Sequence, residues 1–362
     1  MTDAPIIAVD ANGADAGPAE VARGAALAAA SGIRVLLFGP AARLGPQPSG
    51  VQLVDAPASI AKAPDPARAV RANPDASVVQ AWRAVAEGRA DAVVSGGSTG
   101  AALAAGLFGV KRARGIHRPA LAAVVPVPGS PFLLLDAGAN VEVRAEHLVQ
   151  FAHMGAAFME TAMGLRRPRV ALLSNGEEAD RGRPEVVAAH AVLASGSGLD
   201  FIGNVEGFAV GAATADVIVT DGFTGNVALK VMEGTSAALM GAVRAAANSS
   251  SRARVGGALL RPALRGLRDD VDPQAQGGAV LLGLRRLGVV PHGSFGARGF
   301  ARAIEVAARA VREDVSGRTL ERLAAAGALR RAGAQDASAT VASVPGTDDA
   351  NGDLSAGPGT SG

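Results

Sequence analysis

The amino-acid sequence predicts an α/β fold with a mostly parallel β-sheet covered by helices. At least five short runs of Val, Ile, Leu and Ala each end abruptly at a small polar residue beside a glycine. Continuous apolar runs of this length are typical of strands buried on both faces, as in a parallel sheet. Segments with helical periodicity separate the runs, and this alternation indicates βαβ units with right-handed crossovers.

These two patterns give the expected elements in chain order. We expect strands at 5–9, 33–38, 51–54, 92–95, 120–126, 132–136, 169–174, 201–205 and 216–220. We expect helices at 19–30, 75–87, 99–114, 144–163, 184–194 and 224–247. From about residue 256 to 331 the chain is expected to be entirely helical, apart from a loop at 288–295.

The chain is expected to contain one catalytic region and one tail. Residues 1–332 form the catalytic α/β domain, either as one unit or as two subdomains that meet at an active-site cleft. Residues 333–362 are rich in Ala, Ser and Gly and have almost no large apolar side chains. Such a segment cannot bury enough surface to order itself, so we expect a disordered acidic tail.

The composition excludes several classes of protein. Cysteine is absent, so no disulfide, thiolate metal site or cysteine nucleophile can form. The first residues show no basic stretch ahead of an apolar one, so we expect no signal peptide and a cytoplasmic location. The uncharged stretch 92–110 approaches the length of a membrane span, but its five glycines favour a strand, a glycine loop and a helix.

The charge of the chain is modest. The formal net charge is +2, and the segment after residue 333 holds four aspartates and no basic residue, which leaves the body near +6. That value is far from the charge of a nucleic-acid binder, and we expect no nucleic-acid partner. It is compatible with an acidic protein partner or an anionic membrane surface.

The polar segments that end the apolar runs are the candidate functional residues. They lie at 10–13, 95–100, 136–140, 174–178 and 221–226. In open α/β sheets the carboxyl ends of the strands line the ligand crevice, so we expect these segments to converge on one site. Asp10, Asp136 and Asp221 end strands, and each carboxylate either fastens neighbouring loop N–H groups or serves catalysis.

Two of these segments resemble anion-binding turns. Ser98, Thr99 and Gly100 precede an apolar helix, and Thr224-Gly225-Asn226 lies shortly before Lys230. Glycine lets the backbone approach a ligand closely, and the start of a helix offers free N–H groups to an anion. Ordinary helix caps have the same appearance, so either reading stays open for each single turn.

Several common active sites are absent from the sequence. It contains no G-x-x-x-x-G-K-[ST] motif, and the first strand is not followed by G-x-G-x-x-G, which argues against an NTPase and an ordinary dinucleotide dehydrogenase. The five histidines form no H-x-x-x-H pair, and we expect no metal site and no cofactor. His292 follows an apolar run in a glycine turn, where it either donates to a phosphate or thioester oxygen or caps the backbone. Glu177 and Glu178 lie either in a site or in a solvated loop.

Taken in order, the segments resemble the phosphate acyltransferase family of bacterial phospholipid synthesis. The matching segments are 10–15 (DANGAD), 95–101 (SGGSTGA), 118–120 (RPA), 134–140 (LLDAGAN), 147–152 (HLVQFA), 172–178 (LLSNGEE), 201–207 (FIGNVEG) and 217–230 (VIVTDGFTGNVALK). The resemblance spans roughly residues 6–315, and the last segment is quite specific. The chain departs from the family pattern at Asn12, Ala14, Ser98, Arg181 and Phe295.

The resemblance implies an activity, a fold and partners. The reaction converts long-chain acyl-acyl-carrier protein and inorganic phosphate into acyl phosphate and free carrier protein. The implied fold is three-layered, like isopropylmalate dehydrogenase and the phosphotransacetylases, with a helical C-terminal part. The resemblance also implies a homodimer with loose membrane attachment, so the cytoplasmic protein would contact the inner face of the cell membrane.

The chemistry of this reaction fits the candidate residues. Phosphate is itself the nucleophile, so the site must supply an anion pocket, orientation and donors for the developing oxyanion. We expect Lys230 to hold phosphate, Asp221 to orient Lys230 and accept a proton, and His292 or Asn175 to assist the oxyanion. The expected phosphate- and substrate-binding residues are Asp10, Asn12, Gly13, Ser95, Ser98, Thr99, Gly100, Asp136, Asn140, Glu177, Arg181, Asn204, Glu206, Thr224, Gly225 and Asn226.

A basic amphipathic segment follows the last motif. Its leucines share one helical face and its arginines the next, which suits docking on anionic lipid or an acidic carrier protein. An ordinary dimer-packing helix is the alternative. The residues expected to dock are Leu260, Arg261, Leu264, Arg265, Leu267 and Arg268.

Three rival functions are consistent with parts of the pattern. A short-chain phosphotransacetylase that uses coenzyme A shares the fold and the anion-binding turns. A catalytically silent scaffold could bind carrier protein or lipid. A decarboxylating dehydrogenase would need metal-binding aspartates and a nicotinamide pocket, and neither is identifiable in the sequence.

Overall fold

A computed structural model describes residues 4–212, 214–270 and 272–330 of the chain. The side chains of residues 264, 265 and 267–270 lie outside this description. The predicted acidic tail at 333–362 also lies outside the described residues.

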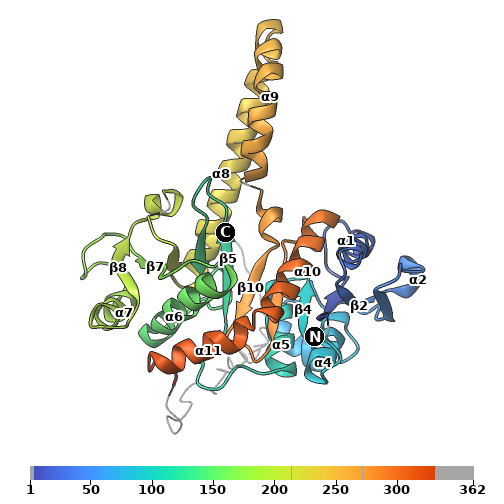
Figure 1. Ribbon diagram of the computed structural model, residues 1–362, viewed down its shortest axis with the longest axis horizontal. Helices are drawn as coiled ribbons and strands as arrows, with labels where there is room; N and C mark the ends of the chain where they lie inside the picture. Colours follow the sequence, from blue (N-terminus) through green and yellow to red (C-terminus); the bar gives the residue numbers. More distant parts are fainter. Residues whose placement is uncertain (1–3, 213, 271, 331–362) are drawn as a thin grey trace, which may run out of the picture. The chain divides into compact units, whose positions relative to one another are not determined.

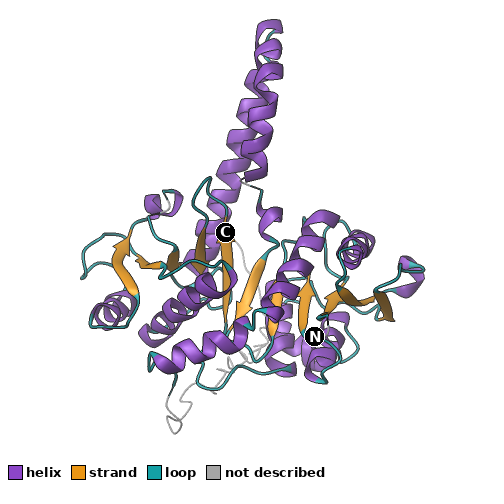
Figure 2. Ribbon diagram, in the orientation of Figure 1, coloured by secondary structure: helices purple, strands orange, loops and turns teal. Residues whose placement is uncertain are grey.

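One sheet of eleven strands forms the centre of the molecule, in the order β3-β2-β1-β4-β11-β10-β5-β6-β9-β7-β8 (Figure 2). All nine predicted strands are present. Their bounds are β1 Ile6–Asp10, β2 Arg34–Gly39, β3 Val51–Asp55, β4 Ala92–Ser95, β5 Ala120–Val125, β6 Phe132–Leu135, β7 Arg169–Leu173, β8 Asp200–Val205 and β9 Val217–Val219. The remaining two are β10 Ala279–Leu282 and β11 Leu287–Val290.

The sheet consists of two parallel groups that run in opposite directions. Strands β1–β4 and β11 form one group, β6–β9 form the other, and the antiparallel pairs of β10 and β5 join them. The register links Val94 to Val289, Val289 to Val280, Val280 to Ala122, and Ala122 to Leu135. Val94 and Leu135 lie near the carboxyl ends of their strands, so these ends approach the same level of the sheet from opposite sides.

Helices cover both faces of the sheet, which confirms the predicted three-layer α/β fold (Figure 1). On one face, α1 Pro18–Ala30, α6 Ala145–Ala162, α7 Pro184–Ala194, α10 Ala297–Arg312 and α11 Val315–Ala325 bury their apolar sides. On the other face lie α3 Pro66–Ala72, α4 Ser77–Ala86, α5 Thr99–Gly109 and the start of α8 Gly222–Asn248. The short α2 spans Ala41–Leu44, and the two 3-10 helices are η1 Gly207–Gly211 and η2 Pro273–Gln276.

The core follows the period-two alternation of the strands. In β1, Ile7 and Val9 pack against the first set of helices, whereas Ala8 between them packs against the second. All three side chains are fully buried. This is the burial on both faces that the continuous apolar runs predict.

The prediction of an all-helical region from 256 to 331 is wrong. Helix α9 Ser251–Asp270 and helices α10 and α11 are present, but the hairpin β10–β11 lies between them. A four-residue apolar run is ambiguous between strand and helix, and long-range pairing decides it. Here β10 pairs with β5 and β11 with β4. Gly277 and Gly278 both adopt positive φ angles, which end the helical path ahead of β10.

Helices α8 and α9 form an antiparallel hairpin that projects beyond the sheet layers (Figure 1). The two helices approach closely at Gly257, where a Cβ atom would meet Ala247. Among the described residues, no helix has the length and apolar character needed to cross a membrane.

Candidate active site

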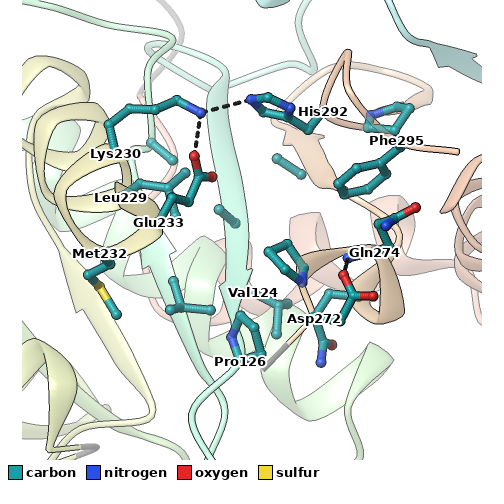
Figure 3. A pocket seen from close by; sticks show the side chains of 18 of the residues that line it. Val124, Pro126, Leu229, Lys230, Met232, Glu233, Asp272, Gln274, His292 and Phe295 are labelled. Atoms are coloured by element: carbon teal, nitrogen blue, oxygen red, sulfur yellow. Dashed lines mark hydrogen bonds and ion pairs between the residues drawn. The ribbon is translucent and has the colours of Figure 1, made fainter. Parts of the chain in front are cut away.

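A cleft of about 740 Å³ lies on the α5 face of the sheet, against β5 and α8 (Figure 3). Its lining comes from segments that are far apart in the sequence. They are the turn after β4, strand β5, the turn after β6, the first half of α8, the segment around η2 and the turn after β11. The cleft therefore lies where the carboxyl ends of the two strand groups approach each other.

The start of helix α5 contributes to the polar lining of the cleft. Gly97, Ser98 and Thr99 line it, and the Oγ of Ser98 accepts a hydrogen bond from the backbone N–H of Ala101 at 3.2 Å. Ser98 is thus the N-cap residue of α5, and its hydroxyl oxygen is partly used in this hydrogen bond. The free N–H groups of the first helical turn remain the principal donors toward an anion.

Lys230 projects into the cleft from α8 (Figure 3). Its Nζ donates to Oε2 of Glu233 at 2.7 Å and lies 3.0 Å from Nε2 of His292. Because an ammonium group can only donate, Nε2 of His292 is the acceptor, and we assign the ring proton to Nδ1. Nδ1 lies 2.7 Å from the Oγ of Ser294 and 3.3 Å from its backbone nitrogen. In the assigned tautomer Nδ1 donates to the hydroxyl, and the longer contact with the backbone N–H is not a hydrogen bond. His292 therefore positions the lysine.

The rest of the cleft is largely apolar. Strand β5 contributes Leu121 and Val125, and helix α8 contributes Leu229 and Met232. Phe295 adds an aromatic wall beside His292, with ring centroids 6.2 Å apart (Figure 3). A cleft with an anion-binding part and long apolar walls suits a ligand that has both a charged group and a hydrocarbon chain.

Asp10 and Ser95 belong to a buried hydrogen-bond network. Asp10 is 3% exposed and accepts hydrogen bonds from the hydroxyls of Ser77 at 2.6 Å and Ser95 at 2.7 Å. Burial raises the pKa of Asp10 to about 6, although these hydrogen bonds act in the opposite direction. The amide of Asn12 donates to Ala56 O at 3.0 Å and to Ser77. Asp10, Asn12 and Ser95, which the motifs suggest as substrate-binding residues, thus tie strand ends together, and none of them lines the cleft.

Gly13 allows this buried network to approach the cleft lining. Its φ angle is +96°, and a Cβ atom would lie 2.7 Å from the Cα of Gly97. The residue thus serves close packing between two turns, and it does not line the cleft.

Asp136 and Asn140 form a second structural network. The buried Asp136 carboxylate accepts hydrogen bonds from the backbone N–H groups of Leu121, Gly138, Ala139 and Asn140. Burial raises the pKa of Asp136, and these hydrogen bonds oppose that effect. Asp136 thus holds the turn through these hydrogen bonds, and neither Asp136 nor Asn140 lines the cleft.

Two glycines seat helix α8 on this turn. A Cβ atom on Gly222 would lie 2.7 Å from Asn140 O, and one on Gly225 would overlap the carbonyl oxygen of Asp136. Gly225 is buried and is therefore a packing residue, whereas the following Asn226 is exposed and lines the cleft.

Asp221 caps helix α8, and its contacts do not include Lys230. It accepts from the backbone N–H of Thr224 at 2.9 Å and from its hydroxyl at 2.7 Å, and Arg183 lies 2.9 Å away. Although burial alone would raise it, these hydrogen bonds hold the pKa of Asp221 below its ordinary value. Lys230 lies more than two helical turns further along α8 and pairs with Glu233, so the predicted contact between Asp221 and Lys230 is not among the interactions of the described residues.

Arg183 is a residue that the sequence did not single out. It precedes α7 and joins the turn after β7 to the start of α8 through Asp221. The sequence signal for Arg183 was its position beside Pro184 at the start of a helix. An arginine at such a position usually extends into solvent, so the signal is weak.

The residues that end β7 and β8 do not line the cleft. Asn175, Glu177 and Arg181 are exposed, and Arg181 lies 3.5 Å from Glu178. These strands are at the far end of the sheet, with β9 between them and β6, so their polar ends form a separate loop cluster. Among the predicted substrate-binding residues, those that the structure leaves outside the cleft lining are Asp10, Asn12, Gly13, Ser95, Gly100, Asp136, Asn140, Glu177, Arg181, Asn204, Glu206, Thr224 and Gly225.

Asn204 holds the loop cluster together. Its Nδ2 donates to Glu178 O at 2.7 Å, while its buried Oδ1 has no hydrogen-bond partner among the described residues. Glu206 precedes η1 and makes no side-chain cap.

A group of possible metal ligands lies away from the cleft. His117, Glu146 and His147 each place one ligand atom within 4.8 Å of the others. Nδ1 of His147 accepts from the backbone N–H of Arg144 at 3.2 Å, which puts the ring proton on Nε2 and leaves no lone pair there for a cation. Sequence spacing does not reveal this group, because residue 117 is distant from the other two.

The predicted docking helix is present as α9. Leu260 is 59% exposed, and Leu259 and Val255 are also exposed. Arg261 is exposed as well. The side chains of the predicted docking residues Leu264, Arg265, Leu267 and Arg268 lie outside what the structure describes.

Comparisons with known proteins agree with an enzyme of this kind. Residues 6–318 match the family described as "Fatty acid synthesis protein". A phosphate acyltransferase from Moorella thermoacetica is 44% identical over 314 residues, which cover 85% of this chain and 92% of that protein. A phosphate acyltransferase from Thermobifida fusca is 41% identical over 309 residues, which cover 83% of this chain and 86% of that protein.

Solved structures share the fold. A phosphotransacetylase from Staphylococcus aureus matches with a TM-score of 0.54 and 18% identity, over 85% of this chain and 94% of that one. A branched-chain phosphotransacylase from Enterococcus faecalis V583 matches with a TM-score of 0.52 and 16% identity, over 84% of this chain and 99% of that one. Identities this low show the fold alone. The structural matches confirm the predicted phosphotransacetylase-like architecture.

The fold and the family match define an enzyme of the fatty acid synthesis protein family. Within that family the chain belongs to the phosphate acyltransferases, as its identity to relatives of that name over most of its length shows. The resemblance drawn from the sequence motifs is thereby confirmed.

Proposed function

We propose that this enzyme transfers a long acyl chain from acyl carrier protein to inorganic phosphate, for glycerophospholipid synthesis. The observation that carries the proposal is the composition of one cleft. It joins the N-terminus of α5, Asn226 and Lys230 to long apolar walls on β5 and α8. Phosphate and a hydrocarbon chain thus each find a matching surface in the same cavity.

The geometry supports direct attack of phosphate on the thioester. The N–H groups at the start of α5 and the ammonium of Lys230 attract the phosphate dianion and hold one of its oxygens toward the carbonyl carbon. A carbon–oxygen bond forms, the carbon–sulfur bond breaks, and the carrier leaves as a thiolate that takes up a proton. The same donors stabilise the oxyanion that develops in between.

His292 has a positioning role in this scheme. Its Nε2 accepts from Lys230, and the assigned tautomer directs its remaining N–H to Ser294. The histidine thus holds the ammonium in place, while Glu233 balances the charge from the other side. Asn175, the alternative helper in the sequence-based hypothesis, lies outside the cleft lining and receives no role.

The test measures acyl phosphate directly. The protein is incubated with palmitoyl-acyl-carrier protein, with and without phosphate, and the product is trapped with hydroxylamine. The proposal requires a trappable product that depends on phosphate. A product formed only from acetyl-coenzyme A would support the short-chain phosphotransacetylase, and no product from either thioester would support a silent scaffold.

We also propose that helix α9 of the α8–α9 hairpin attaches the enzyme to the inner face of the cell membrane. Leu259 and Leu260 are exposed in the middle of this helix, and Arg261 follows them. Apolar side chains beside basic ones suit a surface of anionic lipid. Replacing Leu260 and Leu264 by Glu should release the protein from anionic vesicles in co-sedimentation, and unchanged sedimentation would contradict the attachment.

We also propose that the enzyme forms a homodimer. Phe223, Val227 and Val231 are all exposed and follow one another at single-turn spacing along α8. An apolar stripe of this kind suits contact with a second copy. Light scattering of the wild type and of Val231→Glu tests it, since the stripe predicts a dimer that the substitution weakens.

A further inference from the structure

We propose that a strip of basic side chains beside the cleft docks the acidic surface of the protein that delivers the acyl thioester. This inference rests on the proposed function, because it names the surface through which the carrier reaches the same cleft. The strip, here called the basic strip, consists of Lys111, Arg112, Arg114, Arg118, Arg285 and Arg286.

The backbone fixes the two parts of the basic strip side by side. The N–H of Arg285 donates to Lys111 O at 3.0 Å, and Arg112 forms an isolated antiparallel bridge with Leu284. The guanidinium of Arg112 also donates to His117 O at 2.5 Å. The segment after α5 and the turn of the β10–β11 hairpin therefore present their charges on one surface.

The charge of the basic strip is concentrated and exposed. Lys111, Arg114, Arg285 and Arg286 are exposed, and no ion pair is assigned to any of these four within the described part of the chain. Like charges held this closely repel one another, and an anionic partner relieves that repulsion. Two carboxylates lie near this surface. Glu146 pairs with Arg144 at 3.3 Å, and Asp91, which the β4–β11 register places beside Arg286, accepts from the backbone N–H of Ile6 at 2.8 Å.

The basic strip lies at the turn end of the β10–β11 hairpin, and strand β5 joins it to the cleft lining. Arg118 is followed by Pro119, whose carbonyl accepts from the side chain of Asn140 at 2.7 Å. Two residues later, the N–H of Leu121 donates to Asp136 at 3.0 Å. Leu121 lines the cleft, as does the residue after Asp136. His292 lies beyond the other end of the hairpin, so a carrier seated on the strip has to extend its thioester arm along β5 to reach the anion-binding residues.

The surroundings favour an anionic protein over a cation. The histidine and glutamate group described above adjoins the strip. Burial lowers the pKa of His117, Glu146 opposes this, and the charges of Arg330, Arg112 and Arg144 lower it further. A divalent metal ion would enter a field of positive charge there. Electrostatic complementarity between protein surfaces acts mainly on encounter and specificity, which is what repeated delivery of a carrier requires.

The experiment reverses two charges at the centre of the strip. The double variant Lys111→Glu/Arg285→Glu is compared with the wild type, with palmitoyl-acyl-carrier protein and with palmitoyl-pantetheine as substrates. Palmitoyl-pantetheine carries the same thioester without a protein. The matched control is Arg43→Glu/Arg89→Glu, which reverses two exposed charges outside the strip. Binding of fluorescently labelled carrier protein is measured separately by anisotropy.

We expect the double variant to raise the KM and the Kd for the carrier protein by about tenfold, as loss and repulsion of several exposed charge pairs implies. Its rate with palmitoyl-pantetheine should stay within twofold of the wild type, and the control should match the wild type with both substrates. Unchanged carrier KM and Kd in the double variant would overturn the proposal. A wild type that binds carrier through the strip but makes no acyl phosphate would refute the proposed function and leave the docking surface standing.

Discussion

Lys230→Ala probes the phosphate site most sharply, because the wild-type ammonium has a defined set of contacts. Its side chain is 47% exposed, and two of its three protons have acceptors in Glu233 and His292. The third proton is available to a phosphate oxygen. A hydrogen bond from a charged donor is worth about 1.5–3 kcal/mol, which corresponds to a loss of roughly 10- to 150-fold in kcat/KM for phosphate.

The assay is steady-state formation of hydroxylamine-trappable product at varied phosphate and saturating carrier thioester. The matched control is Lys62→Ala, because Lys62 does not line the cleft. Its phosphate kinetics should equal those of the wild type. Since Lys230 is half exposed, its removal should leave the thermal unfolding midpoint nearly unchanged. Phosphate kinetics within twofold of the wild type for Lys230→Ala would refute the role of this residue.

Three further predictions concern stability. Gly225→Ala places a Cβ atom on the carbonyl of Asp136 and should cost at least about 2 kcal/mol in urea unfolding, whereas Gly234→Ala on the same helix meets nothing and should not destabilise; equal effects would contradict the packing. Asp221→Asn weakens the cap of α8 and the pair with Arg183, so a loss of about 1–2 kcal/mol is expected, and an unchanged melting midpoint would contradict it. Asp10 has a folded-state pKa of about 6 against 3.8 for the free side chain, so its protonated form favours folding at low pH. The unfolding free energy of the wild type relative to Asp10→Asn should therefore fall by about 3 kcal/mol as the pH rises from below 4 to above 6, and a flat difference would contradict the burial of this charge.

The strands were predictable where both of their faces are buried, because such strands are continuous apolar runs in the sequence. Runs such as Val170 to Leu172 are wholly apolar and are followed by a polar turn, and the structure buries them completely. Strands β10 and β11 were missed because they lie among helical segments, without the strand–helix alternation that marks the equally short β4 and β6. Their identity depends on pairing with β5 and β4, which are more than 150 residues away in the sequence.

The reversal of direction between the two strand groups was likewise invisible in the sequence. It depends on the antiparallel pairs of β5 with β6 and β10, and nothing local in these runs marks their direction. This reversal decides which polar turns meet. Residues 97–99, Asn226 and His292 come together, as the motifs suggested, while the turns of β7 and β8 lie elsewhere.

Polar residues at strand ends were harder to assign to roles. Asp10, Asp136 and Asp221 have the same sequence context, and the structure uses all three to fasten backbone or hydroxyl groups. A carboxylate that ends a strand satisfies the free N–H groups of the next turn whether or not a ligand is near. Sequence alone therefore identifies the turn but not which of its side chains faces the cleft.

The measurement closest to the central claim is a crystal structure of the enzyme with phosphate and a non-hydrolysable palmitoyl-pantetheine analogue. The account predicts phosphate within hydrogen-bond distance of the backbone N–H of Thr99 and of Nζ of Lys230, with the hydrocarbon chain along β5 and α8. Phosphate bound instead at the loop of Asn175 and Arg181, with the cleft empty, would contradict it.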